Sequence, residues 1–491
     1  MTRWTAPALA LWMAVAAPAA PLAQEIARLL ESTPAVRGAF WGIEVRDVGT
    51  GNVVYSRNAE RLFVPASNVK LLTTALALER LGSDFRFQTR VLSEAAPDSQ
   101  GHIQGDVRLV GGGDPNLSGR AVPYRLGSAT ENPLAPIEAL ADQAVARGVK
   151  SIGGAIVGDD TWYVWEPFPE GWAVDDTLYE YGAPVSALTI NDNAFTLTLR
   201  PAARAGELAE LTLAPPLEYY QIDNRVETVA AGGVRKVHLD REPGSRQLRL
   251  WGSLPLRAIP EVLFLAVSDP AEYAARALRR ALEDRGIAVA GGVSVAHHFP
   301  GEEHPLADSA GYELARRDSA PLVEDLKITA KVSQNLHGEL ALRAVGRARS
   351  KVGSRQAGLE EMKAFLGEIG IGAAAYSLSD GSGLDRADLV TPSALVKLLR
   401  HMYASPARES WISLLPVGGQ DGTLSERFGE GPAAGRIHAK TGTLSHISTL
   451  SGYAERPDGN TLAFSILVNN YNGPAAEVRS VMDRICTLIL E

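Results

Sequence analysis

The stretch Pro65–Leu78, "PASNVKLLTTALAL", predicts a helix that is buried on several sides. Pro65 is a helix entry signal, and Ser67 and Asn68 are residue types that cap helix starts. Gly82 ends the apolar run about four turns later. The leucines and alanines cover more than one face, which is typical of a helix at the centre of a domain.

Lys70 follows Ser67 by three positions in this helix, and no other lysine in the chain has a serine at that spacing. The two side chains then share one helix face within hydrogen-bonding reach. Burial and the positive end of the helix dipole both favour the neutral amine. A neutral lysine beside a serine is a base beside a nucleophile. The alternative for this spacing alone is a lysine whose amine reaches solvent from a packing helix.

The composition limits the class of protein. With 491 residues the chain is long enough for two or three domains. Its net charge of −9, from 48 basic and 57 acidic residues, argues against a general nucleic-acid binder. The single cysteine, Cys486, can make no internal disulfide.

The N-terminal residues 1–23 read as a secretory signal peptide. "MTRWTAPALALWMAVAAPAAPLAQ" holds one basic residue, an apolar run too short to span a bilayer, and then small residues. Cleavage after Ala19 and cleavage after Ala23 both fit, and a short membrane anchor is the alternative. We therefore expect an exported, periplasmic protein with no transmembrane anchor after signal removal.

The predicted secondary structure changes in character twice along the chain. Residues from about 25 to 88 read as a helix, two strands and the helix above, whereas residues 89 to 270 hold short alternating runs separated by Gly, Pro and Asp. Helices return beyond about 307, followed by three apolar strands. The simplest architecture is one α+β domain built from both chain ends, with a β-rich insertion between them.

Two further motifs lie in the second part of the chain. Ser333 and Asn335 form a Ser-x-Asn step in "TAKVSQNLHGELAL", and residues 440–443 read Lys-Thr-Gly-Thr in "HAKTGTLS". Together with Ser-x-x-Lys, in this order, they resemble the signature of penicillin-binding proteins and class A β-lactamases.

The motif residues fit the roles of an acyl-enzyme carboxypeptidase. Ser67 attacks a carbonyl while Lys70 takes its proton, and the N–H groups of Ser67 and Thr443 hold the oxyanion. Ser333 relays a proton, and Asn335 either holds the substrate amide or orients Lys70. The expected site for a terminal carboxylate and the neighbouring substrate comprises Lys440, Thr441, Gly442 and Thr443.

The resemblance extends over nearly the whole chain. Stretches such as "VRLVGGGDPNLS", "GAPVSALTINDNAF" and "LPVGGQDGTLSERF" look like the D-alanyl-D-alanine carboxypeptidase/endopeptidase family, the class C low-molecular-mass penicillin-binding proteins. It implies a transpeptidase/β-lactamase-like domain, an antiparallel sheet flanked by helices, split by an insertion of two smaller domains. Gln334 is a departure, because many relatives in the wider superfamily have Asp there. The implied units are residues 24–88 with 308–491, 89–165 with 270–307, and 166–269.

Within the insertion, "VGDDTWYV" resembles a family segment whose aspartate reaches the mouth of the active site and meets the amino end of a diaminopimelate side chain. Asp159 and Asp160 both fit this role, and a turn that ends a strand is the alternative for either. In "SDGSGL", Asp380 is expected to cap a tight glycine turn near the cleft.

The sequence thus predicts an exported serine DD-peptidase that removes the terminal D-alanine from peptidoglycan stem peptides, with cleavage of D-alanyl-diaminopimelate cross-links as a second activity. β-Lactams should acylate the same serine. The rivals are a β-lactamase and a non-catalytic peptidoglycan-binding scaffold. The chemistry needs no metal or organic cofactor. The polar segment with His297, His298 and His304 is expected to be a solvated loop rather than a metal site.

Overall fold

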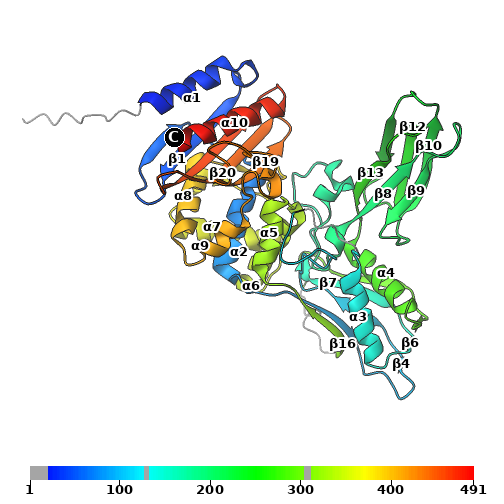
Figure 1. The fold of residues 1–491 in the computed structure, drawn as a ribbon. Coiled ribbons are helices and arrows are strands. Elements are labelled where there is room, and N and C mark those ends of the chain that lie inside the picture. Colours follow the sequence, from blue (N-terminus) through cyan, green and yellow to red (C-terminus); the bar gives the residue numbers. More distant parts are fainter. Residues whose placement is uncertain (1–19, 127–131, 303–310) are drawn as a thin grey trace, which may run out of the picture.

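The computed structural model describes residues 20–126, 132–302 and 311–491 (Figure 1). Residues 1–19 of the predicted signal peptide lie outside this range, as does His304. The first described element is α1 (Ala20–Ser32). Among the described residues, no helix has the length and apolar character needed to cross a membrane.

Strands from both chain ends form one five-stranded antiparallel sheet. Its order is β19-β20-β21-β1-β2, so the first strand pairs directly with the last. We call this sheet with its helices the split unit. The strands are β1 (Phe40–Asp47), β2 (Val53–Arg57), β19 (Ile437–Leu444), β20 (Ile447–Glu455) and β21 (Thr461–Asn469).

Helices cover both faces of this sheet, each over its own apolar core (Figure 1). On one face α1 packs with α10 (Ala475–Leu490), and on the other lies a layer of six helices. This agrees with the predicted antiparallel sheet flanked by helices. The six are α2 (Val69–Leu81), α5 (Leu322–Lys331), α6 (Asn335–Ser350), α7 (Arg355–Glu368), α8 (Pro392–Ala404) and α9 (Arg408–Leu414); a small ladder joins β17 (Tyr376–Ser377) to β18 (Leu389–Val390).

The predicted helix at the start of the motif is present, and it opens with a short 3-10 turn, η2 (Ala66–Asn68). All residues of Val69–Leu78 are buried, and Gly82, with φ of +83°, ends the helix. Ser67 therefore lies in the turn, one residue before Asn68, which occupies the N-cap position of α2 without a capping hydrogen bond from its side chain.

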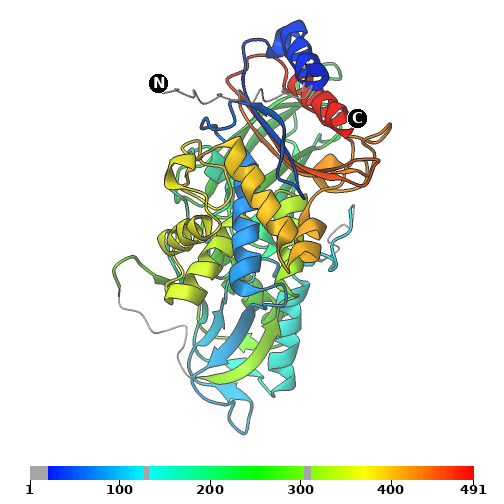
Figure 2. The same cartoon turned by 90° about the vertical axis from the view of Figure 1, so that its left-hand side faces the viewer.

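A second sheet, in the order β15-β7-β5-β3-β16, forms the inner insert together with helices α3 (Ala135–Ala146) and α4 (Pro270–Glu283). Figure 2 shows it below the helices of the split unit. The strands are β3 (Gln88–Ser93), β5 (Val107–Val110), β7 (Ile156–Val164), β15 (Val293–His298) and β16 (Tyr312–Asp318), and a smaller sheet joins β4 (His102–Ile103), β6 (Ser151–Ile152) and β14 (Ala288–Val289).

The predicted return of the chain to the split unit at residue 308 is wrong. β16 pairs with β3, and Asp318 lies opposite Gln88, so the inner insert continues to residue 318. The chain thus leaves and re-enters the split unit on adjacent strands. Strand pairing between segments this far apart leaves no mark in a single sequence, which explains the misplaced boundary.

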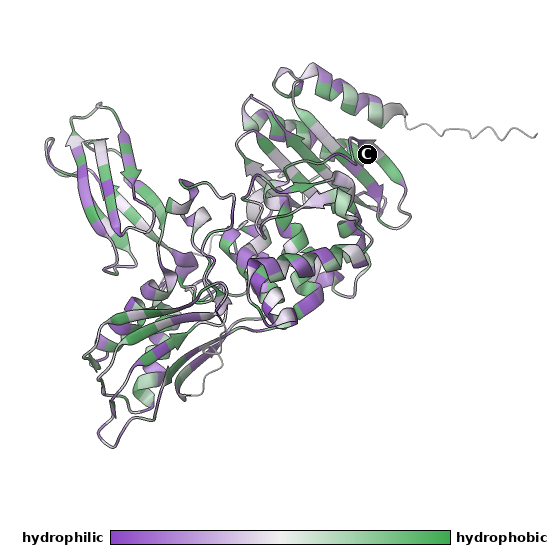
Figure 3. Cartoon of the chain, turned by 180° about the vertical axis from the view of Figure 1, so that it is seen from behind, coloured by the Kyte–Doolittle hydropathy of each residue, from purple (hydrophilic) through white to green (hydrophobic). Residues whose placement is uncertain are grey.

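Two three-stranded sheets form the outer insert. Their strands alternate between exposed and more buried residues, and Figure 3 shows the same alternation in hydropathy. Residues 166–193, predicted to belong to this unit, instead form short 3-10 turns beside the split unit. The strands are β8 (Ala194–Arg200), β9 (Glu210–Ala214), β10 (Gln221–Val229), β11 (Lys236–Asp240), β12 (Gln247–Pro255) and β13 (Glu261–Ala266).

Candidate active site

Lys70 is completely buried, and its ammonium group has three partners from three parts of the chain. Its Nζ atom lies 3.0 Å from Oγ of Ser67, 2.6 Å from Oδ1 of Asn335 and 2.6 Å from the carbonyl oxygen of Ser382. Two of the three motifs therefore meet at one amine. Of the two roles predicted for Asn335, the geometry matches the orientation of Lys70.

The surroundings of Lys70 favour its neutral form. Burial lowers the pKa of Lys70 to about 8, although the negative charges of Asp380, Glu339 and Asp388 act in the opposite direction. Near neutral pH a useful fraction of the amine is uncharged while it remains within reach of the Ser67 hydroxyl. The pair can therefore act as base and nucleophile.

Lys440, which was predicted to form a carboxylate site with Thr441 and Thr443, lies against Ser333 and is not among the residues that line the cavity described below. Its Nζ atom donates to Oγ of Ser333 at 2.8 Å and to the carbonyl oxygen of Thr441 at 2.7 Å, and the side chain is completely buried. Burial and the nearby Lys70 lower the pKa of Lys440 well below its usual value. Lys440 thus holds Ser333 in place from inside the protein.

A cavity of about 550 Å³ opens over these residues. Ser67, Ser333 and Asn335 line it, as does Thr443 at the end of β19. The predicted oxyanion donors, the backbone N–H groups of Ser67 and Thr443, thus belong to residues that line the same cavity. Further lining residues are Gly171, Ala173, Asp175, Asp176, Tyr181, Gly383, Leu384, Arg386, Leu444 and Ser445.

Gly442 allows β19 to approach the nucleophile closely. A Cβ atom on Gly442 would lie 2.3 Å from Oγ1 of Thr449 and 2.9 Å from the backbone nitrogen of Ser67. No side chain fits this gap, so the predicted need for glycine at this position has a steric cause. Thr441, beside it, turns its hydroxyl to Thr423 at 2.8 Å.

Asp380 caps the glycine turn, as predicted. Its carboxylate accepts the backbone N–H groups of Ser382 at 2.9 Å and Gly383 at 2.6 Å, and the indole N–H of Trp172 at 3.0 Å. This turn presents the Ser382 carbonyl to Lys70. Asp380 therefore fixes one of the three acceptors around the catalytic amine.

Asp159 and Asp160, predicted at the mouth of the site, are buried in β7 and do not line the cavity. Asp159 pairs with Arg108 at 3.3 Å, and Asp160 accepts from Ser186 at 2.8 Å. Asp160 also lies 2.8 Å from His297, which belongs to β15 and not to the solvated loop expected for it. These side chains hold the inner insert together.

The carboxylates that do line the cavity are those of Asp175 and Asp176, which were not predicted from the sequence. Arg386 lines the same cavity, so both signs of charge border it. Their segment, "GWAVDDTLYEYG", carries no motif, and its only signal is an acidic doublet among aromatic residues in a region without strand alternation.

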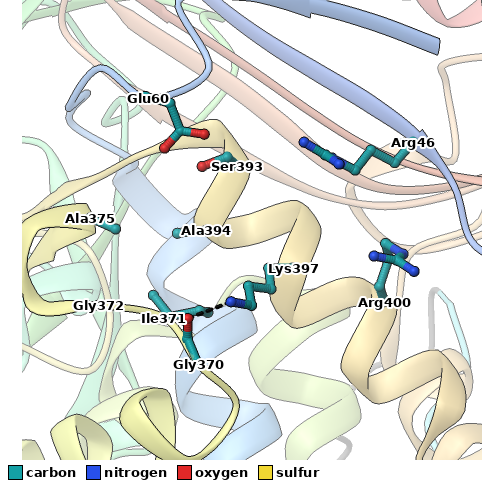
Figure 4. Close-up of a pocket in the computed structure, with 10 residues that line it drawn as sticks. All are labelled: Arg46, Glu60, Gly370, Ile371, Gly372, Ala375, Ser393, Ala394, Lys397 and Arg400. Carbon is teal, nitrogen blue, oxygen red and sulfur yellow. Dashed lines mark hydrogen bonds between the residues drawn. The ribbon is translucent and has the colours of Figure 1, made fainter. Parts of the chain in front are cut away.

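A second cavity, of about 380 Å³, lies beside α8 (Figure 4). It contains none of the motif residues. Two of its cations already have partners, since Arg46 pairs with Glu44 and Lys397 donates to the carbonyl oxygen of Gly370. We therefore place the active site at the Ser67 cavity.

A buried lysine beside a serine on a cavity wall is the arrangement that a serine acyl-transfer enzyme uses. The chain belongs to the D-Ala-D-Ala carboxypeptidase 3 (S13) family, whose model matches residues 22–488. It is 37% identical over 481 residues to a D-alanyl-D-alanine carboxypeptidase of Actinomadura sp. (strain R39), covering 96% of this chain and 84% of the relative. It is also 26% identical over 440 residues to D-alanyl-D-alanine carboxypeptidase DacB of Haemophilus influenzae, covering 89% and 86%.

The fold agrees with this assignment. A crystal structure of penicillin-binding protein 4 (dacB) from H. influenzae matches with a TM-score of 0.81 at 24% identity, covering 95% of this chain and 99% of that one. A second structure of that protein is a complex with a β-lactam. The predicted family, the penicillin-binding fold and the enzyme class, a serine-type D-Ala-D-Ala carboxypeptidase, are confirmed.

Proposed function

We propose that this protein is an exported DD-peptidase that cleaves the terminal D-Ala-D-Ala bond of peptidoglycan stem peptides through an acyl-enzyme on Ser67. The observation that carries the proposal is the 3.0 Å contact between Lys70 Nζ and Ser67 Oγ at the wall of the cavity. Family membership supports D-Ala-D-Ala as the bond that is cleaved, and the geometry supports Ser67 as the nucleophile.

The reaction follows from the positions of the groups. Neutral Lys70 takes the hydroxyl proton of Ser67 as Oγ bonds to the carbonyl carbon of the penultimate D-alanine. The backbone N–H groups of Ser67 and Thr443 hold the negative oxygen. Ser333, held by Lys440, relays a proton to the leaving amine as the peptide bond breaks. Water then attacks the ester and releases the shortened peptide, and the proton returns to Ser67.

The charged border of the cavity suits the third residue of the stem peptide. The free end of a diaminopimelate side chain carries one ammonium and one carboxylate. We assign the ammonium to Asp175 or Asp176 and the carboxylate to Arg386, in place of the predicted role of Asp159 and Asp160. The same arrangement would bind the donor strand of a D-alanyl-diaminopimelate cross-link, which supports endopeptidase activity as a second function.

The proposal includes acylation by β-lactams and a periplasmic location. A β-lactam presents a strained carbonyl to the same serine, and the β-lactam complex of the H. influenzae protein is consistent with this. A β-lactamase additionally needs a base for rapid deacylation. Among the described residues that line the cavity, the carboxylates are Asp175 and Asp176, and Asp176 accepts a hydrogen bond from the hydroxyl of Tyr181 at 3.1 Å rather than from Ser67.

Intact-mass measurement after incubation with a penicillin tests the nucleophile, with Ser67→Ala as the control. We expect a stoichiometric adduct on the wild type alone, and release of D-alanine from a diacetylated tripeptide ending in D-Ala-D-Ala. No adduct on the wild type with the antibiotic intact would favour the scaffold, and no adduct with the antibiotic consumed would favour a β-lactamase.

A further inference from the structure

The segment just before the outer insert contains an unusual turn, residues 191–193. The side chain at its centre contacts the Ser-x-Asn loop. Asn191, Asp192 and Asn193 have φ values of +47°, +55° and +53°, three successive residues in the left-handed region. Asn and Asp enter this region more easily than other non-glycine residues, but they normally do so singly, and three in succession are unusual. Strain of this kind persists only where the surroundings fix the conformation, and it concentrates at functional sites.

Hydrogen bonds from the asparagines fix this turn. Asn193 accepts the backbone N–H of Ile190 at 3.2 Å and donates to the carbonyl oxygen of Pro184 at 2.8 Å, and Asn191 donates to that of Ala194 at 2.8 Å. The turn is therefore held on both sides. This fixed backbone sets the direction of the side chain at the centre of the turn, Asp192.

The carboxylate of Asp192 reaches across to the split unit and contacts Gln334 and His337, which flank Asn335 in the sequence. Oδ2 accepts from Nε2 of Gln334 at 3.0 Å, and Oδ1 lies 3.0 Å from Nε2 of His337. Arg120 completes the set with a bidentate ion pair to the same carboxylate. Burial alone would raise the pKa of Asp192, but Arg120 and His337 outweigh it and hold that pKa well below its usual value.

The residues on either side of Gln334 are those that touch the two lysines. Ser333 has a φ of +66° and accepts from Lys440, and Asn335 accepts from Lys70 and donates to the carbonyl oxygen of Tyr181 at 2.8 Å. The Gln334 side chain also accepts the backbone N–H of Leu336, so it joins the start of α6 to Asp192.

We propose that Asp192 is a positioning residue for acylation, which sets the geometry of Ser333 and Asn335 by holding Gln334 and His337. The inference rests on the proposed function. It also accounts for Gln334: a carboxylate at this position would face the charge of Asp192 in a partly buried place, whereas the amide donates to it. The insertion is thus part of the catalytic geometry as well as a wall of the cavity.

The test is a cycle of nearly isosteric variants: Gln334→Glu, Asp192→Asn and the double variant. Gln334→Glu sets two carboxylates against each other, and the double variant restores one donor and one acceptor. We expect the second-order rate constant for acylation by a penicillin to fall about ten-fold or more in Gln334→Glu and to return to within about three-fold of the wild type in the double variant. Asp142→Asn, at an exposed ion pair with Arg285, is the matched control and should leave the rate unchanged.

The final stoichiometry separates positioning from folding. Slow but complete acylation, with Tm near that of the wild type, supports the inference. Partial acylation at the normal rate, with a lowered Tm, would mean that Asp192 only stabilises the fold. If the wild type is acylated and the variants react at the same rate, or if the losses add in the double variant, this inference alone is overturned. If the wild type is never acylated, the proposed function is overturned and this inference with it.

Discussion

The ammonium of Lys440 donates to the hydroxyl of Ser333 at 2.8 Å, and neither Lys440 nor Lys70 is accessible to solvent. The site therefore contains two buried lysines, each in contact with one serine. Under the proposed function, Ser67 attacks the substrate and Ser333 passes on a proton. The sequence predicted Lys440 as a contact for substrate, and in the structure its amine contacts Ser333 and the carbonyl oxygen of Thr441.

Because Lys440 acts through Ser333 in the proposed reaction, removing both side chains should lower the acylation rate constant no more than removing one of them. We expect Ser333→Ala and Lys440→Met each to lower the acylation rate constant by about ten-fold or more, and the double variant to fall within about three-fold of Ser333→Ala. Stopped-flow acylation by a chromogenic β-lactam measures all three. Additive losses would show that Lys440 contacts the substrate independently.

The lowered pKa of Lys70 predicts the pH dependence of acylation. Only the neutral amine accepts the Ser67 proton, so the rate constant should rise with pH through a midpoint near 8. Lys70→Arg, whose guanidinium stays charged, should abolish acylation while Tm stays near that of the wild type. A profile that is flat between about pH 6 and pH 9 would remove Lys70 from the role of base.

The charged border of the cavity predicts substrate selectivity. The double change Asp175→Asn with Asp176→Asn, and Arg386→Ala on its own, should each lower kcat/KM about ten-fold on a stem peptide with a free diaminopimelate end, because each removes the charged partner of one end group. Both should retain wild-type activity on a peptide whose third side chain is blocked. Equal losses on the two peptides would mean that these residues shape the cavity without recognising charge.

Some of the site could be predicted from the sequence because its signal is local. The spacing of Ser67 and Lys70 is fixed by one stretch of chain, and the two remaining motifs are each a few residues long. Asp192 and Gln334 meet across 142 positions, so their relationship exists only in the folded chain. Asp159 and Asp175 each begin an acidic doublet, so the doublet alone does not tell the residue at the cavity from the one buried in a strand.

Gly442 gives a steric prediction with a built-in control. Gly442→Ala places a Cβ atom 2.9 Å from the Ser67 nitrogen, so either β19 or η2 must shift. We expect an acylation rate constant lowered by about ten-fold or more and a loss of about 1–3 kcal/mol in the free energy of unfolding. Gly367→Ala is the control: that glycine lies exposed in α7 with no atom within 4 Å of the added Cβ, so the change should stabilise the fold by up to about 1 kcal/mol and leave acylation unchanged. Denaturant unfolding measures the free energy of unfolding of both variants, and acylation kinetics measure their rate constants. A Gly442→Ala enzyme with wild-type kinetics would mean that the strand need not approach the nucleophile so closely.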